Sequence, residues 1–417
     1  MPSPLGRSVL IYSAAFAVAG ATPFLLLPIL TRALSPQQFG EVTSFLILTT
    51  VLANVAGLSA HGFVSVRYFK SPAAEFKALV SSAAVAVVAA HVVAALSVAA
   101  LFPLLQRLLG LPLGLSLFAV AAALALSLNL IFLAIFQSTG QPMLYLRARL
   151  IQGGFEFFLC VALLALFVPD SGARIYSYAA AVAASAFAGL LLCLRRGHLG
   201  RSIDRTQIRS LAAFGVPMLP HIVAGSALAY LDRVMVSSLL GTESLGIFMV
   251  AMQIGMVMFV LIEPLNKALA PWLFEQLAKD EPAMRQMIVR KTYLLSAALI
   301  AIGVVVAVVA SAFFDQLIGA RYAAAKPLVP LLVAGFVLQG MYYTVVNYLF
   351  YAERTGRLSV MSGFAAVVGC AVSYGLTSSY GLLGAGLSFA VNNGILFVLV
   401  WFAAARVVPM PWLLGQH

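Results

Sequence analysis

The sequence predicts an all-α integral membrane protein with about twelve transmembrane helices, in two pseudo-symmetric six-helix bundles around a central cavity. Of the 417 residues, 63% are hydrophobic and only 9% are charged, whereas a soluble domain has roughly 45–50% and about 25%. The apolar runs are continuous over about 20 residues, which indicates helices rather than barrel strands. A basic segment divides the chain near its midpoint. This composition excludes a water-soluble enzyme.

The expected helices follow one another with short connections, several of which contain Pro or Gly. An even number of spans places both termini on the same side of the membrane. The expected spans are 8–33, 40–63, 76–101, 113–136, 143–168, 174–194, 209–240, 246–268, 289–312, 327–350, 357–378 and 381–404.

The distribution of Lys and Arg predicts the orientation. One set of connections and span ends holds 19 of these residues and the opposite set, which includes Arg174, holds 5, while Arg233 lies inside a span. Cytoplasmic loops collect Lys and Arg, so both termini are expected in the cytoplasm. This bias also accounts for most of the net charge of +12, and a nucleic-acid partner is not expected.

The basic connection 195–209 (RRGHLGRSIDRTQIR) separates two halves of nearly equal length. We expect an N-terminal bundle over 1–200 and a C-terminal bundle over 206–417. The segments 34–40 (LSPQQFG) and 240–246 (LGTESLG) close the first hairpin of each half with the same length and a final Gly. Two parallel six-helix bundles are an arrangement that alternating access uses.

Span five carries the clearest polar stripe. An ionised side chain at mid-bilayer costs on the order of 3 kcal/mol, so each one needs a reason. Tyr145, Arg149, Gln152 and Glu156 recur at helical spacing on one face. Arg149 is expected either to contact the substrate or to neutralise Glu156, and Arg147 either to contact the substrate or to snorkel at the boundary.

The other candidates also have a structural alternative. Asp232 and Arg233 could join neighbouring helices through polar contacts. Lys267 lies four residues after Glu263 and could form a structural ion pair with it. The tyrosines of span ten could form an interfacial belt. The candidate substrate-binding residues are Arg149, Arg147, Arg32, Gln152, Glu156, His221, Asp232, Arg233, Lys267, Tyr343 and Asn347.

Three degenerate motifs resemble those of bacterial polysaccharide-export proteins. They are Thr31-Arg32-x-Leu34-x-x-x-x-Phe39-Gly40, then Asp232-Arg233 followed by Gly241-x-x-x-Leu245-Gly246-Ile247-Phe248, and Phe314-x-x-x-Ile318-Gly319-x-x-Tyr322. With the length and the span count, they make the chain similar to the O-antigen flippases (Wzx-type) of the MOP superfamily, whose fold is shared with MATE exporters.

The resemblance implies a flippase that moves an undecaprenyl-pyrophosphate-linked oligosaccharide, an O-antigen or exopolysaccharide repeat unit, to the periplasmic leaflet of the bacterial inner membrane. The implied partners are this substrate, membrane lipids and the polysaccharide polymerase machinery. Two alternatives stay open: a MATE-like exporter of cations or drugs, and a membrane polysaccharide polymerase or transferase.

The sequence offers no catalytic motif such as HExxH, GxSxG or a P-loop, so no enzyme activity is expected. Its three cysteines lie in apolar stretches without metal-ligand spacing. We therefore expect no cofactor or metal, with coupling to H⁺ or Na⁺ left open.

Overall fold

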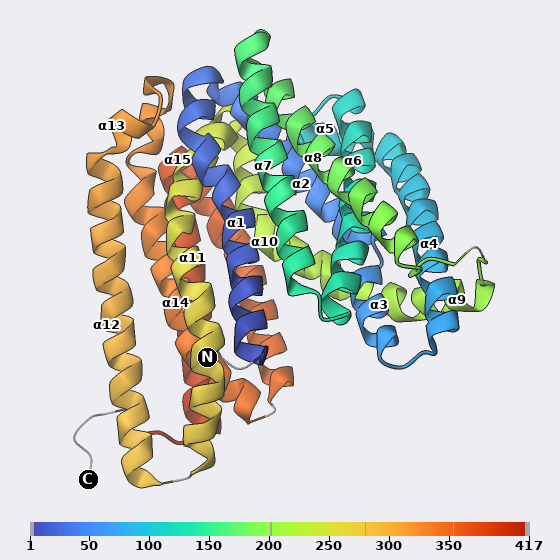
Figure 1. The fold of residues 1–417 in the computed structure, drawn as a ribbon. Coiled ribbons are helices and arrows are strands. Elements are labelled where there is room, and N and C mark those ends of the chain that lie inside the picture. The colour runs from blue at the N-terminus through green and yellow to red at the C-terminus, as the bar shows by residue number, and fades with distance from the viewer. Residues whose placement is uncertain (1–3, 201, 280, 353, 413–417) are drawn as a thin grey trace. The chain divides into compact units, whose positions relative to one another are not determined.

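The computed structural model describes residues 4–200, 202–279, 281–352 and 354–412, and every regular element within these ranges is a helix (Figure 1). Position 201, in the basic connection, lies outside the described residues. The helices are α1 (Pro4–Ala33), α2 (Pro36–Ala56), α3 (Ala60–Tyr68), α4 (Ala73–Ala100), α5 (Phe102–Leu109), α6 (Leu113–Ser138), α7 (Pro142–Leu166), α8 (Ser171–Arg195), α9 (Arg205–Gly215), α10 (Leu219–Leu240), α11 (Thr242–Ala278), α12 (Pro282–Ala312), α13 (Phe314–Leu317), α14 (Leu328–Tyr351) and α15 (Thr355–Val407), with 3-10 turns η1 (Val216–Met218) and η2 (Ala320–Ala325).

The chain divides into two compact units, Met1–Tyr230 (unit 1) and Leu231–His417 (unit 2). The all-α membrane fold that the sequence predicts is confirmed. Within the described residues, ten segments are long and apolar enough to cross a membrane. The last of them, Val360–Val407, has 48 residues, which is enough for two crossings. With α1, which has 30 residues, the count reaches the expected twelve. The bundle boundaries at 200 and 206 and the symmetry between halves stay predictions.

The first hairpin of unit 1 owes its geometry to a capping box. The Ser35 hydroxyl accepts a hydrogen bond from the Gln38 backbone N–H at 3.3 Å, and the Gln38 side chain accepts one from the Ser35 N–H at 2.9 Å. Pro36 occupies the first turn of α2, where its missing N–H costs nothing. The matching hairpin of unit 2 uses another device, because Gly241 adopts φ 88° before α11, a conformation that favours glycine.

Two of the predicted continuous spans are interrupted in unit 1. The span expected over 40–63 breaks after α2, where Leu58 and Ser59 have φ of 50° and 52°. The span expected over 209–240 breaks at η1, because Pro217 has no N–H to continue the helix. The two breaks meet: a Cβ on Gly215 would lie 2.3 Å from the carbonyl oxygen of Leu58. Close backbone contact here requires a glycine.

The basic connection between α8 and α9 folds back onto α4. The Gly200 N–H donates to the Lys77 carbonyl at 3.1 Å, and the Ser81 hydroxyl donates to the Gly200 carbonyl at 2.8 Å. Asp204 then caps α9 through the Thr206 amide and hydroxyl, and these hydrogen bonds hold the pKa of Asp204 below its ordinary value. Hydrogen bonds to α4 thus fix the path of the connection.

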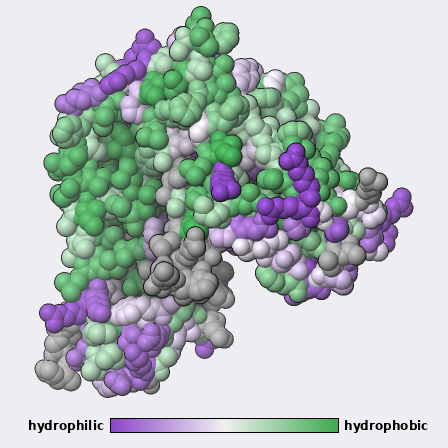
Figure 2. Space-filling model, in the orientation of Figure 1, coloured by the Kyte–Doolittle hydropathy of each residue, from purple (hydrophilic) through white to green (hydrophobic). Residues whose placement is uncertain are grey.

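In unit 2, α14 packs against α11, α12 and α15. The long helix α15 folds back on itself at Gly381, which has φ 58° and ψ −136°. Consistent with this turn, the Asn392 amide donates to the Ser373 hydroxyl at 2.9 Å across the two halves. The span expected to end at 268 continues as α11 to Ala278. Figure 2 shows hydrophobic residues along the left-hand helices, including α12, with hydrophilic residues at their ends.

Candidate substrate-binding site

The polar stripe predicted on span five lies on α7 in unit 1. Tyr145, Arg149 and Gln152 are half-buried and Glu156 is buried. The guanidinium carbon of Arg149 lies 5.7 Å from the centre of the Tyr145 ring, which is within cation–π distance. Arg147, two residues earlier, is exposed. Of the two arginines, Arg149 is therefore the one that the protein partly encloses.

The carboxylate of Glu156 is paired, but with Arg174. Arg174 Nη1 lies 2.5 Å from Glu156 Oε1, and the two side chains are 5% and 9% exposed. Arg174 belongs to the first turn of α8, so the pair joins α7 to α8. The distribution of Lys and Arg predicts Arg174 in a connection or span end of the opposite set, but its side chain is buried inside unit 1.

The alternative in which Arg149 neutralises Glu156 is therefore wrong. Seven residues along one helix rise about 10.5 Å, whereas the neighbouring helix brings a guanidinium into direct contact. Among the described residues, none of the ion pairs includes Arg149. Its positive charge is available to an anionic ligand.

A chain of uncharged hydrogen bonds runs beside this pair. The Asn129 amide on α6 donates to the Gln152 side-chain oxygen at 3.0 Å, and the Ser185 hydroxyl on α8 donates to Asn129 Oδ1 at 2.9 Å. Three helices of unit 1 thus share one polar network. Gln152 contributes to that network, which gives it a structural role in addition to its candidate role.

Three candidates lie on α10 beyond the break at η1. His221 is exposed. Asp232 and Arg233, the first polar residues of unit 2, form an ion pair of 3.4 Å with side chains that are 11% and 14% exposed. Arg32 lies in the last turn of α1 and is exposed. The roles of these four residues in substrate binding stay predictions.

Unit 2 brings three predicted residues into one region between α11 and α14. Lys267 pairs with Glu263 at 3.1 Å, as the spacing suggested. The Asn347 amide donates to Asn266 Oδ1 and to the Tyr343 carbonyl, both at 3.0 Å. The Tyr343 ring stacks at a tilt on Tyr342, with ring centroids 5.5 Å apart.

Sequence reasoning missed residues that complete these clusters from a neighbouring helix. Arg174 and Asn266 make side-chain hydrogen bonds to the predicted residues Glu156 and Asn347. Ser185 makes one to Asn129, the partner of Gln152. The available signal was the presence of polar residues inside otherwise apolar spans. Within the described residues, no group of three or more His, Cys, Asp or Glu is placed to hold a metal ion.

Solved structures of membrane transporters share this architecture. The lipid II flippase MurJ in an inward closed conformation has a TM-score of 0.71 at 12% identity, with 95% of this chain and 87% of that chain covered. A multidrug resistance MATE transporter in an inward-facing conformation has a TM-score of 0.67 at 13% identity, with 94% of each chain covered. At these identities the likeness is one of fold.

The chain belongs to the family described as "Polysaccharide biosynthesis protein", which matches residues 5–277. Two proteins of Haemophilus influenzae are related in sequence. "Lsg locus putative protein 1" is 25% identical over 168 residues, which cover 40% of this chain and less than half, 41%, of that protein. An "Uncharacterized membrane protein" is 25% identical over 358 residues, covering 84% of this chain and 85% of that protein.

Proposed function

We propose that this chain is a flippase that moves a polyprenyl-pyrophosphate-linked oligosaccharide from the cytoplasmic to the periplasmic leaflet by alternating access. The family and the transporter fold support the general class. The oligosaccharide would be an O-antigen or exopolysaccharide repeat unit, and the membrane the bacterial inner membrane with both termini in the cytoplasm. The chain would act without chemistry of its own and would deliver its product to a polysaccharide polymerase.

One observation carries this proposal: the half-buried guanidinium of Arg149 lacks an acidic partner in the described part of the chain. A pyrophosphate must leave water to cross the hydrocarbon core, which is costly unless donors replace its hydration. A guanidinium offers a planar pair of donors that matches phosphate oxygens. The exposed Arg147 would attract the same group before it reaches Arg149. Arg32, in the last turn of α1, belongs to the opposite set of basic residues and would meet the group on the periplasmic side.

The sugars need other contacts. Tyr343 and Asn347 lie together on α14, where a phenol ring can stack on a sugar face and an amide can exchange hydrogen bonds with hydroxyls. Gln152 offers similar chemistry in unit 1. The charged candidates Glu156, Asp232, Arg233 and Lys267 already have ion-pair partners, and together with His221 they would tune the surroundings of the substrate or couple transport to H⁺ or Na⁺.

A MATE-like exporter of organic cations is the competing function, because the fold is shared. Such an exporter needs carboxylates that are free to meet a cation. Here Glu156, Asp232 and Glu263 are each paired with a basic residue. This pairing favours an anionic substrate.

A deletion strain of the source organism tests the proposal. Loss of surface polysaccharide together with accumulation of its lipid-linked repeat unit on the cytoplasmic side is the expected result. Complementation with the intact chain should reverse both effects. Unchanged surface polysaccharide with new sensitivity to cationic drugs would contradict the proposal and favour the MATE-like alternative.

A further inference from the structure

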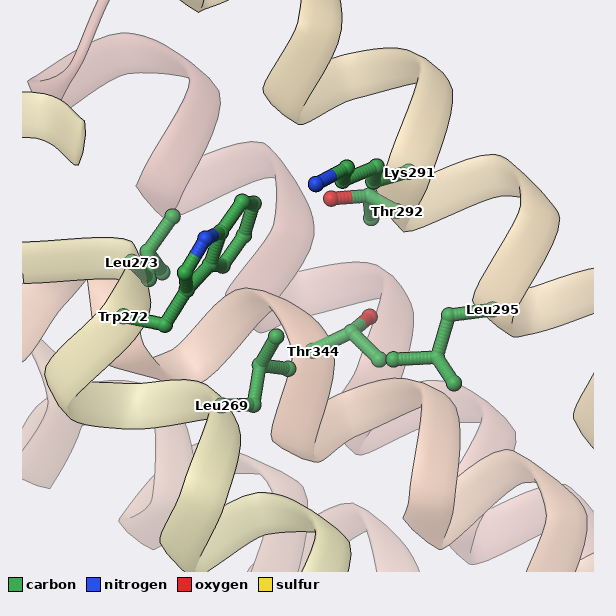
Figure 3. Close-up of a pocket in the computed structure, with 7 residues that line it drawn as sticks. All are labelled: Leu269, Trp272, Leu273, Lys291, Thr292, Leu295 and Thr344. Atoms are coloured by element: carbon green, nitrogen blue, oxygen red, sulfur yellow. The ribbon is translucent and has the colours of Figure 1, made fainter.

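A separate cavity lies within unit 2 and is lined by residues of α11, α12 and α14 (Figure 3). Its volume is about 230 Å³, below the roughly 300–1,000 Å³ of pockets that enclose a drug-sized molecule. Leu269, Leu273 and Leu295 supply much of its lining. A cavity of this size and character suits part of an apolar chain rather than a whole sugar.

The cavity contains one cation. The Lys291 ammonium lies 4.6 Å from the centre of the Trp272 ring, and Figure 3 shows the two side chains facing each other across the cavity. Among the ion pairs of the described residues, none involves Lys291. A cation–π contact leaves the ammonium N–H groups on the far side free to donate, so an anion can bind without displacing Trp272.

The hydroxyl groups of the cavity do not compete for that role. The Thr292 hydroxyl donates to the Ile288 carbonyl at 3.0 Å, and the Thr344 hydroxyl donates to the Met341 carbonyl at 2.7 Å. Their protons are engaged, which leaves the Lys291 ammonium as the charged donor for a ligand. A single cation above apolar walls matches an amphiphile that carries one negative group next to a hydrocarbon chain.

The position of Lys291 on α12 favours a lipid as the ligand of the cavity. Beyond Lys291 the helix presents a long apolar surface, beginning with Leu294, which is 61% exposed, and continuing through Ile300, Val304 and Val308. Before it come Arg285 and Arg290. The cavity therefore lies where basic residues give way to the membrane-facing surface, and basic pockets at this level attract anionic lipid headgroups.

We propose that this cavity binds an anionic phospholipid, with the headgroup phosphate on Lys291 and the adjoining methylenes between Trp272 and the leucines. The bound lipid is a membrane component rather than the transported substrate, so the site is independent of the function proposed above. It would tie α11, α12 and α14 together at the membrane boundary.

Lipid titration of the purified full-length protein, followed by native mass spectrometry, tests this assignment. The probes are phosphatidylglycerol and phosphatidylcholine with identical acyl chains. The intact chain should bind phosphatidylglycerol more tightly. Lys291→Gln should weaken that binding about fivefold and leave phosphatidylcholine unchanged, whereas Lys291→Arg should keep the preference. Arg290→Gln is the matched control, a basic neighbour outside the cavity, and should leave the preference intact.

A second variant separates the cavity from general surface charge. Thr344→Leu should fill the cavity and weaken both lipids while Lys291 remains. Equal binding of the two lipids by the intact chain, or an unchanged preference in Lys291→Gln, would overturn the proposal. Displacement of phosphatidylglycerol by undecaprenyl phosphate at a much lower concentration than by unlabelled phosphatidylglycerol would also overturn it, because the cavity would then belong to the carrier lipid. None of these outcomes depends on whether the chain transports an oligosaccharide.

Discussion

At the scale of single residues, the structure shows that Glu156 of the α7 stripe pairs with a residue of another helix and not with Arg149. Helical spacing predicts that Arg149, Gln152 and Glu156 share a face. Gln152 makes a hydrogen bond, Glu156 makes an ion pair, and Arg149 lies over the ring of Tyr145. The pattern could not predict the partner of Glu156, because spacing relates residues within one helix and Arg174 comes from the next. Because Arg174 neutralises Glu156, Arg149 remains a candidate for binding an anion.

The buried pair gives a prediction about stability. Arg174→Ala should lower the free energy of unfolding by about 3–5 kcal/mol, because it leaves the Glu156 carboxylate buried and unpaired. Denaturant unfolding in detergent measures the change. Lys326→Ala is the control, since the Lys326–Asp315 pair is largely exposed and such pairs contribute roughly 0–1 kcal/mol. Equal effects of the two substitutions would refute a structural role for the buried pair.

At the scale of helices, length and hydropathy predict the spans well and their interruptions poorly. The breaks at Leu58–Ser59 and at η1 fall inside apolar runs, where backbone contact between two segments decides the conformation. The sequence does contain Gly57, Gly215 and Pro217, but such residues also occur in uninterrupted membrane helices. The contacts between helices in unit 1 are also hard to predict, because they depend on which small residue of one helix packs against which residue of another.

One such contact distinguishes adjacent glycines on α7. A Cβ on Gly153 would lie 2.8 Å from Thr22 Oγ1 on α1, whereas one on Gly154 meets nothing within 4 Å. Gly153→Ala should therefore destabilise the protein by about 1–3 kcal/mol. Gly154→Ala should be neutral or stabilise it by up to about 1 kcal/mol through helix propensity. Thermal unfolding of the two variants in one detergent checks the difference, and identical midpoints would contradict the close packing of α1 on α7.

At the scale of the whole molecule, the membrane class and the family follow from composition and motifs, and the apolar helices of the structure and the family match bear them out. The orientation rests on the distribution of Lys and Arg alone. The substrate is least accessible to sequence reasoning, because the fold serves lipid flippases and drug exporters alike.

The predicted orientation can be measured with single cysteines. In a background without Cys160, Cys193 and Cys370, Ser202→Cys in the basic connection should resist a membrane-impermeant maleimide on intact cells. Gln106→Cys, in the exposed segment α5 on the opposite side, should react. Both should react after permeabilisation, which controls for burial. Labelling of Ser202→Cys on intact cells would contradict the predicted cytoplasmic position of the basic connection and indicate the opposite orientation.

The central claim is that Arg149 binds the pyrophosphate of the transported lipid, and complementation of the deletion strain at matched membrane levels tests it most directly. Charge-assisted contacts contribute about 1.5–3 kcal/mol, so Arg149→Ala should reduce export of surface polysaccharide roughly 10-fold to 100-fold. Arg149→Lys should recover part of the export, because the charge survives without the planar fork. Arg107→Ala, an exposed arginine on α5, should leave export at the wild-type level. Wild-type export by Arg149→Ala would contradict the claim.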